Sequence, residues 1–129
     1  YRELFKPSTQ QATPYSAFVM NVVAADTDEK AQHFFTTLQQ NVVRMRRNTR
    51  GQLPPPIQSL DDFCEPHEQA AAAHTLQCSV VGSLETIKRG MRQWLDKTGA
   101  NELIFTGQIF DHQARLKSFE IAAKAAQSL

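Results

Sequence analysis

The stretch AFVMNVVAA, from Ala17 to Ala25, decides the fold of this 129-residue chain. Every residue in it except Asn21 is apolar, and there is no alternation between apolar and polar positions. A strand with this pattern is buried on both faces, as strands of a parallel sheet are. The stretch therefore predicts a parallel α/β arrangement in which helices cover the strand.

A helix is expected directly after this strand. Asp26 and Glu29 form a capping pair three residues apart, and an apolar stripe follows at steps of three and four residues. The stripe consists of Ala31, Phe34, Phe35, Leu38, Val42 and Met45. Gly51 can end the helix, because glycine readily adopts the left-handed conformation of a helix cap.

The alternation of strand and helix continues toward the carboxyl terminus. A helix is predicted from Pro66 to Gln77, and Cys78 to Val81 predicts a very short strand. Ser83 is expected to cap the next helix, which stops at Gly99. Glu102 to Gly107 predicts a second long strand. The order of strand, helix, strand and helix is typical of a parallel α/β fold.

The ends of the chain and its middle connector are predicted separately. Asp111 is expected to cap a final helix that extends to Gln127. Leu116, Phe119 and Ala123 are its predicted inward-facing residues. Residues 53–57, which contain three prolines, predict an extended connector, and residues 1–6 predict the tail of a helix that ends before Pro7.

Length and composition narrow the classes of function. The chain has room for one domain but is well short of the ~250 residues of a closed eight-unit barrel. Its net charge of +1 favours neither nucleic acid nor a membrane surface as a partner. No apolar run approaches the ~20 residues of a membrane-spanning helix, so we expect a cytoplasmic protein with Cys64 and Cys78 as free thiols.

Several motifs, taken in order, carry a family resemblance. They are NVVAADTDE from Asn21 to Glu29, LPPP from Leu53 to Pro56, VGSLET from Val81 to Thr86, TGANEL from Thr98 to Leu103 and DHQARLKSFE from Asp111 to Glu120. Together they resemble the carboxyl-terminal part of luciferase-like flavin-dependent monooxygenases. The family usually has proline after the Gly-Ser pair, where this chain has Leu84.

The resemblance implies a fold and an activity. Residues 1–129 would be a single partial domain, the carboxyl-terminal fragment of a (β/α)8 TIM-type barrel, helix-rich with two or three parallel strands. The family implies reduced flavin mononucleotide (FMN), or a deazaflavin in some branches, with oxygen and a small organic substrate. The missing amino-terminal part would supply the cofactor contacts, so the chain alone is expected to lack catalytic residues. Its open strand edges predict a homo-oligomer.

Two candidate sites follow from particular residue types. Cys64, His67, His74 and Cys78 have the ligand types of a zinc site, but the two histidines lie seven positions apart on one predicted helix. We therefore expect no metal. Gly82 and Ser83 open a helix after a strand, where backbone amides can bind a phosphate, but simple capping of the helix is the preferred interpretation of the pair.

Other polar and aromatic residues are interpreted as structural. His112 follows the cap residue Asp111 and is expected to be a first-turn helix residue, and His33 a surface or half-buried one. Four arginines form a solvated patch at a helix end, and four aromatic residues belong to the core rather than to a flavin-stacking site. These sets are Arg44, Arg46, Arg47 and Arg50, and Phe34, Phe35, Trp94 and Phe105.

The sequence allows two alternatives to the monooxygenase hypothesis. One is a stand-alone, non-catalytic interaction domain that uses the same order of strands and helices. The other is a deazaflavin-dependent oxidoreductase of the same barrel family. The monooxygenase hypothesis and the deazaflavin-dependent oxidoreductase hypothesis share one requirement. Polypeptide from outside this chain must cover the strands at Ala17 to Ala25 and Glu102 to Gly107.

Overall fold

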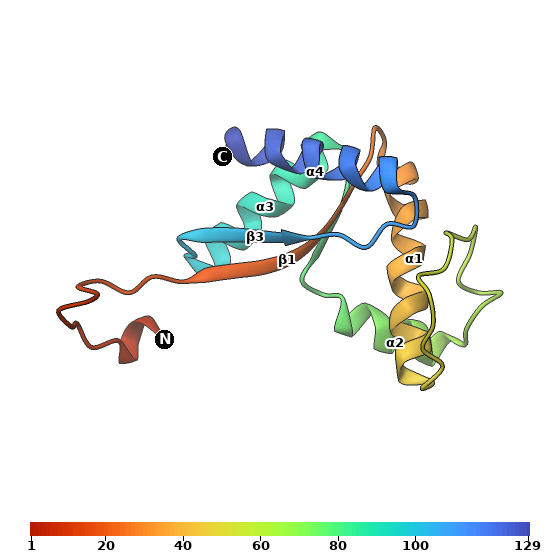
Figure 1. Cartoon of the computed structure of the whole chain (residues 1–129), viewed down its shortest axis with the longest axis horizontal. Helices are drawn as coiled ribbons and strands as arrows, with labels where there is room; N and C mark the ends of the chain where they lie inside the picture. The colour runs from red at the N-terminus through yellow and green to blue at the C-terminus, as the bar shows by residue number, and fades with distance from the viewer.

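The computed structural model describes residues 1–129 and consists of a three-stranded parallel sheet with helices on both faces (Figure 1). The elements in chain order are η1 (Arg2–Leu4), β1 (Ala17–Ala24), α1 (Asp28–Arg46), α2 (Pro66–Thr75), β2 (Ser79–Gly82), α3 (Leu84–Thr98), β3 (Glu102–Thr106) and α4 (His112–Gln127). The predicted α/β class, with parallel strands and four principal helices, is confirmed. No helix is long and apolar enough to cross a membrane.

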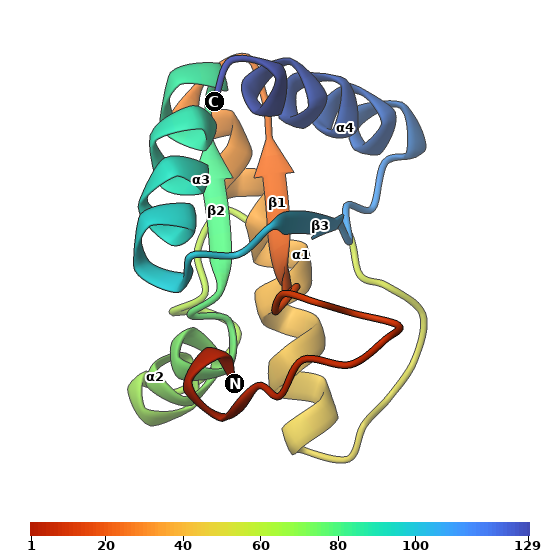
Figure 2. The same ribbon diagram turned by 90° about the vertical axis from the view of Figure 1, so that its left-hand side faces the viewer.

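The sheet has the order β2-β1-β3, so β1 is the central strand. Val22 of β1 is opposite Val80 of β2, and Met20 is opposite Phe105 of β3. Because parallel crossovers are right-handed, the two connections, which run in opposite directions along the sheet, place their helices on opposite faces. Figure 2 shows α3 and α1 on the two sides of the sheet. Consecutive barrel units would instead place β2 between β1 and β3.

One core lies between the sheet and the helices α3 and α4. Met20, Val22 and Ala24 alternate along β1 toward this face, and each is at most 1% exposed. The rest of this core consists of Val80, Ile87, Met91, Ile121, Ala122 and Ala125. Phe18 closes it at the amino end of β1 by stacking on Trp94, with ring centroids 4.7 Å apart.

A second core lies on the opposite face, beneath α1. Val23 of β1 is fully buried there against α1, α2 and the loop after β3. Its other members are Phe35, Leu38, Val42, Val43, Cys64, Ala72, Leu76 and Ile109. The extended connector is fixed to α1 by two hydrogen bonds, from the Gln40 side chain to the Pro55 carbonyl at 2.9 Å and from the Ile57 amide to the Thr36 hydroxyl at 2.9 Å.

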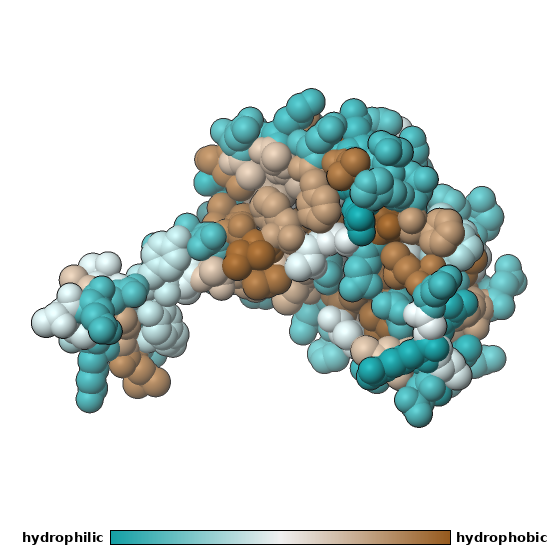
Figure 3. Space-filling view, viewed as in Figure 1, coloured by the Kyte–Doolittle hydropathy of each residue, from teal (hydrophilic) through white to brown (hydrophobic).

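The face beneath α1 is covered at only one end of the sheet. Val19 of β1 and Ile104 of β3, which are paired in register, are 52% and 42% exposed. Figure 3 shows apolar side chains gathered over β1 and β3 on the molecular surface. The prediction that both strands need cover from other polypeptide is therefore wrong for the carboxyl half of β1, while its amino half and β3 do remain open on this face.

Several local predictions are corrected. Thr27, rather than Asp26, caps α1, and its hydroxyl accepts a hydrogen bond from the Lys30 amide at 3.2 Å. The helix ends at Arg46 and not near Gly51, because Asn48 adopts the left-handed conformation with φ 56°. Met45 was predicted to belong to the buried stripe but is 46% exposed. The predicted amino-terminal helix is only the single turn η1.

The buried face of α4 also differs from the prediction. Leu116 and Phe119 are 44% and 37% exposed, and Ala123 is exposed as well. The buried residues are instead Ser118, Ile121, Ala122 and Ala125. Small side chains allow α4 to approach β1 closely, and the Ser118 hydroxyl accepts a hydrogen bond from the Ala24 amide at 2.8 Å.

Candidate functional site at the carboxyl edge of the sheet

The carboxyl ends of β1 and β2 meet at one edge of the sheet, where α/β proteins generally bind their ligands. Thr27 and Asp28 follow β1, and Gly82 and Ser83 end β2 and lead into α3. Ala24 and Gly82 are register partners, so the two loops start side by side. This edge is the candidate site that the sequence places at the Gly-Ser pair.

The Asp28 carboxylate joins the two loops. Its Oδ1 accepts a hydrogen bond from the Ser83 amide at 2.6 Å, and its Oδ2 accepts one from the Thr86 hydroxyl at 3.0 Å. Both donors belong to the start of α3, where free amides and the helix dipole favour negative charge. The Ser83 amide, followed by the Ser83 and Thr86 side chains, lowers the pKa of Asp28 from its ordinary value.

Gly82 makes this contact sterically possible. A Cβ atom at this position would lie 2.6 Å from Asp28 Oδ1 and 2.5 Å from Thr86 Cγ2. Its φ of 155° is also one that residues with a Cβ rarely adopt. Any larger residue would have to displace the carboxylate from α3.

The predicted role of Ser83 is therefore only partly correct. Ser83 precedes α3 as expected, but its side chain makes no capping hydrogen bond. The amide that was a candidate for phosphate is used by Asp28. No local sequence pattern predicts this arrangement, because Asp28 and Ser83 are 55 positions apart and each is also a common residue at a helix start.

The loop after β3 carries the Asp111 and His112 pair. Asp111 caps α4 as predicted, since its Oδ1 accepts a hydrogen bond from the Ala114 amide at 2.7 Å. His112 is the first residue of α4, and its Nδ1 lies 3.0 Å from Nη2 of Arg115 in the same turn. The two side chains have separate partners and do not form a catalytic dyad. His112 is thus a first-turn helix residue, as predicted.

A polar cavity of about 540 Å³ lies between α1 and the segment leading into α2. Its lining residues are Glu29, Gln32, His33, Thr36, Gln39, Gln58, Ser59, Leu60, Asp61 and Gln69. The cavity contains two carboxylates and no lysine or arginine, so it does not suit a phosphate. His33 is half-buried in its wall, within the range expected from the sequence.

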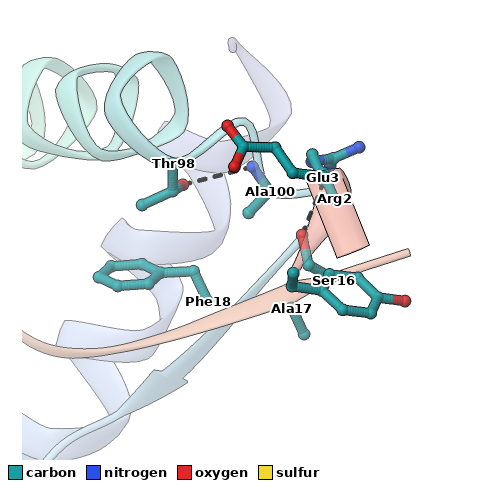
Figure 4. A pocket seen from close by; sticks show the side chains of 8 residues that line it. Arg2, Glu3, Ser16, Ala17, Phe18, Thr98 and Ala100 are labelled. Atoms are coloured by element: carbon teal, nitrogen blue, oxygen red, sulfur yellow. Dashed lines mark hydrogen bonds between the residues drawn. The ribbon is translucent and has the colours of Figure 1, made fainter. Parts of the chain in front are cut away.

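A second cavity, of about 480 Å³, lies at the opposite, amino edge of the sheet (Figure 4). Arg2 forms part of its wall and donates hydrogen bonds to the Gly99 carbonyl and, at 2.8 Å, to Asn101 Oδ1. These bonds tie the amino-terminal turn to the end of α3. The Phe18 ring lies at the inner side of this cavity.

The residue types of the zinc hypothesis do not form a cluster. No three His, Cys, Asp or Glu side chains are grouped so that they could hold a metal ion. His67 and His74 both lie on α2, whereas Cys64 precedes this helix and Cys78 follows it. Cys64 is part of the second core, and burial raises the pKa of its thiol. A buried, neutral thiol is a packing residue rather than a metal ligand.

The arginines at the end of α1 have partners within the chain. Arg47 forms a pair of hydrogen bonds with the Glu68 carboxylate, both at 2.6 Å, and Arg46 donates to the Thr75 hydroxyl at 3.0 Å. The guanidinium groups of Arg44 and Arg47 also lie 5.9 and 5.4 Å from the Phe63 ring centroid. These contacts support a structural patch.

The aromatic residues interpreted as core do belong to it. Phe35 is buried beneath α1, with Phe34 packed beside that core, and Trp94 and Phe105 pack against the core beneath α3 and α4.

Comparison with known proteins identifies relatives over the whole chain, although no family model matches. The chain is 44% identical over 129 residues to proteins named luciferase-like monooxygenase from two Escherichia coli strains, K12 and O6:H1, covering all of this chain and 38% of each relative. It is 36% identical over 123 residues to the uncharacterized protein YvbT of Bacillus subtilis, covering 95% of this chain and 37% of that protein.

A solved structure is similar over nearly the whole of this chain. The crystal structure of apo-MsnO8 superimposes with a TM-score of 0.85 at 28% identity, covering 98% of this chain and 39% of that one. The chain thus spans about 38% of the length of the curated relatives it matches first. The resemblance to luciferase-like monooxygenases that the sequence motifs indicated is confirmed.

Proposed function

We propose that this chain, which is related along its whole length to luciferase-like monooxygenases, works as the carboxyl-terminal part of a flavin-dependent monooxygenase. The observation that carries the proposal is the 44% identity, which extends over all 129 residues. The reaction would use reduced FMN and oxygen to oxidise a small organic substrate. When bound, reduced flavin supplies the electrons that activate oxygen.

The residues of this chain do not by themselves fit a flavin. The amide at the start of α3 is already bonded to Asp28, and the cavity beside α1 has carboxylates but no basic side chain. A phosphate group would meet negative charge at both places. Flavin contacts would then come from the remainder of a longer protein, and the 129 residues would be catalytically silent when isolated.

The larger fold in this proposal is the (β/α)8 barrel that the family resemblance implies, and the exposed apolar surface supports the presence of further polypeptide around this sheet. Val19 and Ile104 form an uncovered patch on β1 and β3, while the outer edges of β2 and β3 have no partner strand in the sheet. In the larger protein, additional strands would pair with these edges and further polypeptide would cover the patch. In isolation the same edges favour association with a second copy of the chain. Such a protein would function in the cytoplasm.

The proposal is tested by comparing the chain with the full-length protein of which it forms a part. FMN fluorescence titration should detect binding to the longer protein and none to the 129 residues. Oxygen consumption with reduced FMN, and with aldehyde, alkane or sulfonate substrates, then measures the activity. Binding of reduced deazaflavin but not of FMN would replace the monooxygenase with a hydride-transferring oxidoreductase. Absence of binding to either cofactor would favour a non-catalytic interaction domain.

A further inference from the structure

We propose that Asp28 is an internal anion that occupies the amino-terminal end of α3, excludes phosphate from it and fixes the β1–α1 loop against the β2–α3 loop. In this role Asp28 is a positioning residue, because it acts through the loops at the ligand-binding edge of the sheet. The inference rests on the geometry of the contact and does not depend on the proposed monooxygenase activity.

The contact has the chemistry of a bound anion. Asp28 uses one carboxylate oxygen for the Ser83 amide and the other for the Thr86 hydroxyl, at 2.6 and 3.0 Å. A phosphate at a helix start takes the same kinds of donor, a backbone amide together with a nearby hydroxyl group. Asp28 therefore provides at the start of α3 the negative charge that a phosphate would provide, while the Ser83 side chain makes no capping hydrogen bond.

A cation lies beside these two donors. Arg89 lies one turn into α3, with its Nη2 3.5 Å from the Thr86 hydroxyl, and its charge acts on Asp28. Removal of the Asp28 carboxylate would leave the Ser83 amide and the Thr86 hydroxyl without their acceptor, with the positive charge of Arg89 beside Thr86. These donors and the nearby positive charge are complementary to phosphate. The Asp28 carboxylate therefore keeps phosphate out of a position that would otherwise suit it.

Gly82 indicates that the close approach is built into the backbone. Asp28 Oδ1 lies only 2.6 Å from the position that a Cβ of residue 82 would take, and Gly82 itself is buried at the end of β2. The two loops are consequently held together at the edge of the sheet without an external ligand.

Inorganic phosphate is the probe that tests this role. The unfolding midpoint of the wild-type chain and of Asp28→Ala is compared in phosphate and in chloride at equal ionic strength, with Ser83 amide chemical shifts as a local readout. We expect the Asp28→Ala variant to gain a stabilisation of about 5 °C at a phosphate concentration ten times its Kd. The wild type should gain none.

Two further variants make the result decisive. Glu29→Ala removes a carboxylate from the same turn of α1 that makes no hydrogen bond to α3, and it should respond to phosphate as the wild type does. Asp28→Ser covers the case in which Asp28→Ala does not fold in chloride, since phosphate should then restore folding of either variant. Absence of a phosphate response in both Asp28 variants, or an equal response in the wild type, would overturn the proposal.

Discussion

The two halves of β1 have similar apolar sequences but different surroundings. Val19 and Val23 lie on the same face of the sheet, four residues apart, yet Val19 is 52% exposed and Val23 is fully buried beneath α1. The difference arises because β1 and α1 diverge, so that the helix lies beside the carboxyl half of the strand while the amino half extends away from it (Figure 1). An apolar run thus identifies a strand, but the position of the covering helix decides which residues it buries.

The largest expected effect comes from placing a charge in each half. Val23→Asp should cost about 4 kcal/mol or more and unfold the chain, because the carboxylate would be buried without a partner. Val19→Asp should change the free energy of unfolding by less than about 1 kcal/mol. Chemical denaturation followed by circular dichroism measures both values. Equal losses in the two variants would show that the halves do not differ in cover.

The helices on the other face provide a second matched pair. Met91→Ala should cost about 2–5 kcal/mol, because Met91 is fully buried between α3 and β1 and its loss leaves a cavity. Leu116→Ala, at a position that helical spacing assigned to the core, should cost less than about 0.5 kcal/mol. The midpoint of urea unfolding compares them. A larger loss for Leu116 would mean that α4 is rotated on the sheet.

An intermediate effect is expected where α4 is bonded to the covered half of β1. Ser118→Ala should cost about 1–3 kcal/mol, because the buried Ala24 amide would lose its acceptor. Hydrogen exchange at the Ala24 amide should become faster. Ser128→Ala, which removes a less buried hydroxyl after the end of α4, is the control and should leave that exchange rate unchanged.

The smallest effect concerns an ion pair on the outside of the helices that cover β1. Arg47 lowers the pKa of Glu68 from 4.5 to about 2. Because the folded pKa is below the ordinary value, the pair stabilises the chain above pH 4.5 and this contribution is lost as the pH falls toward 2. Glu68→Gln should therefore reduce the loss of stability across this range, measured by thermal unfolding at each pH.

A control isolates the ion pair from general acid effects. Glu85→Gln removes a carboxylate from the first turn of α3 that forms no salt bridge within the chain, so a smaller change for this variant than for Glu68→Gln attributes the effect to the Arg47–Glu68 pair. If both glutamine variants have the wild-type profile, the Arg47–Glu68 contact contributes nothing measurable to stability, as many exposed ion pairs do.

The boundaries of the elements were largely predictable. The predicted strand from Ala17 to Ala25 and the strand from Glu102 to Gly107 each extend only one residue beyond the observed strands. Gly99 ends α3 in the left-handed conformation and Asp111 caps α4. These features depend on the conformational preference of each residue and on its neighbours in the chain, and both can be read from the sequence.

The buried face of α4 was not predictable by the same rule. Helical spacing selected the larger residues Leu116 and Phe119, whereas the face in contact with β1 consists mostly of small residues and Ile121. A helix that approaches a strand closely buries small side chains, and the larger ones are left at the rim. The strand order β2-β1-β3 was likewise absent from the prediction, because parallel strands pair across long crossovers.

The candidate site likewise contains residues that the sequence predicted and one that it did not. Gly82 and Ser83 were recognised as the start of a helix after a strand, but not Asp28, whose partners are 55 and 58 positions away. By itself the sequence determined the strands, the helices, the caps at Gly99 and Asp111 and the resemblance to luciferase-like monooxygenases, since these depend on local residue patterns. Only the tertiary structure decided which apolar residues are covered and which anion occupies α3, because both depend on contacts between segments far apart in the chain.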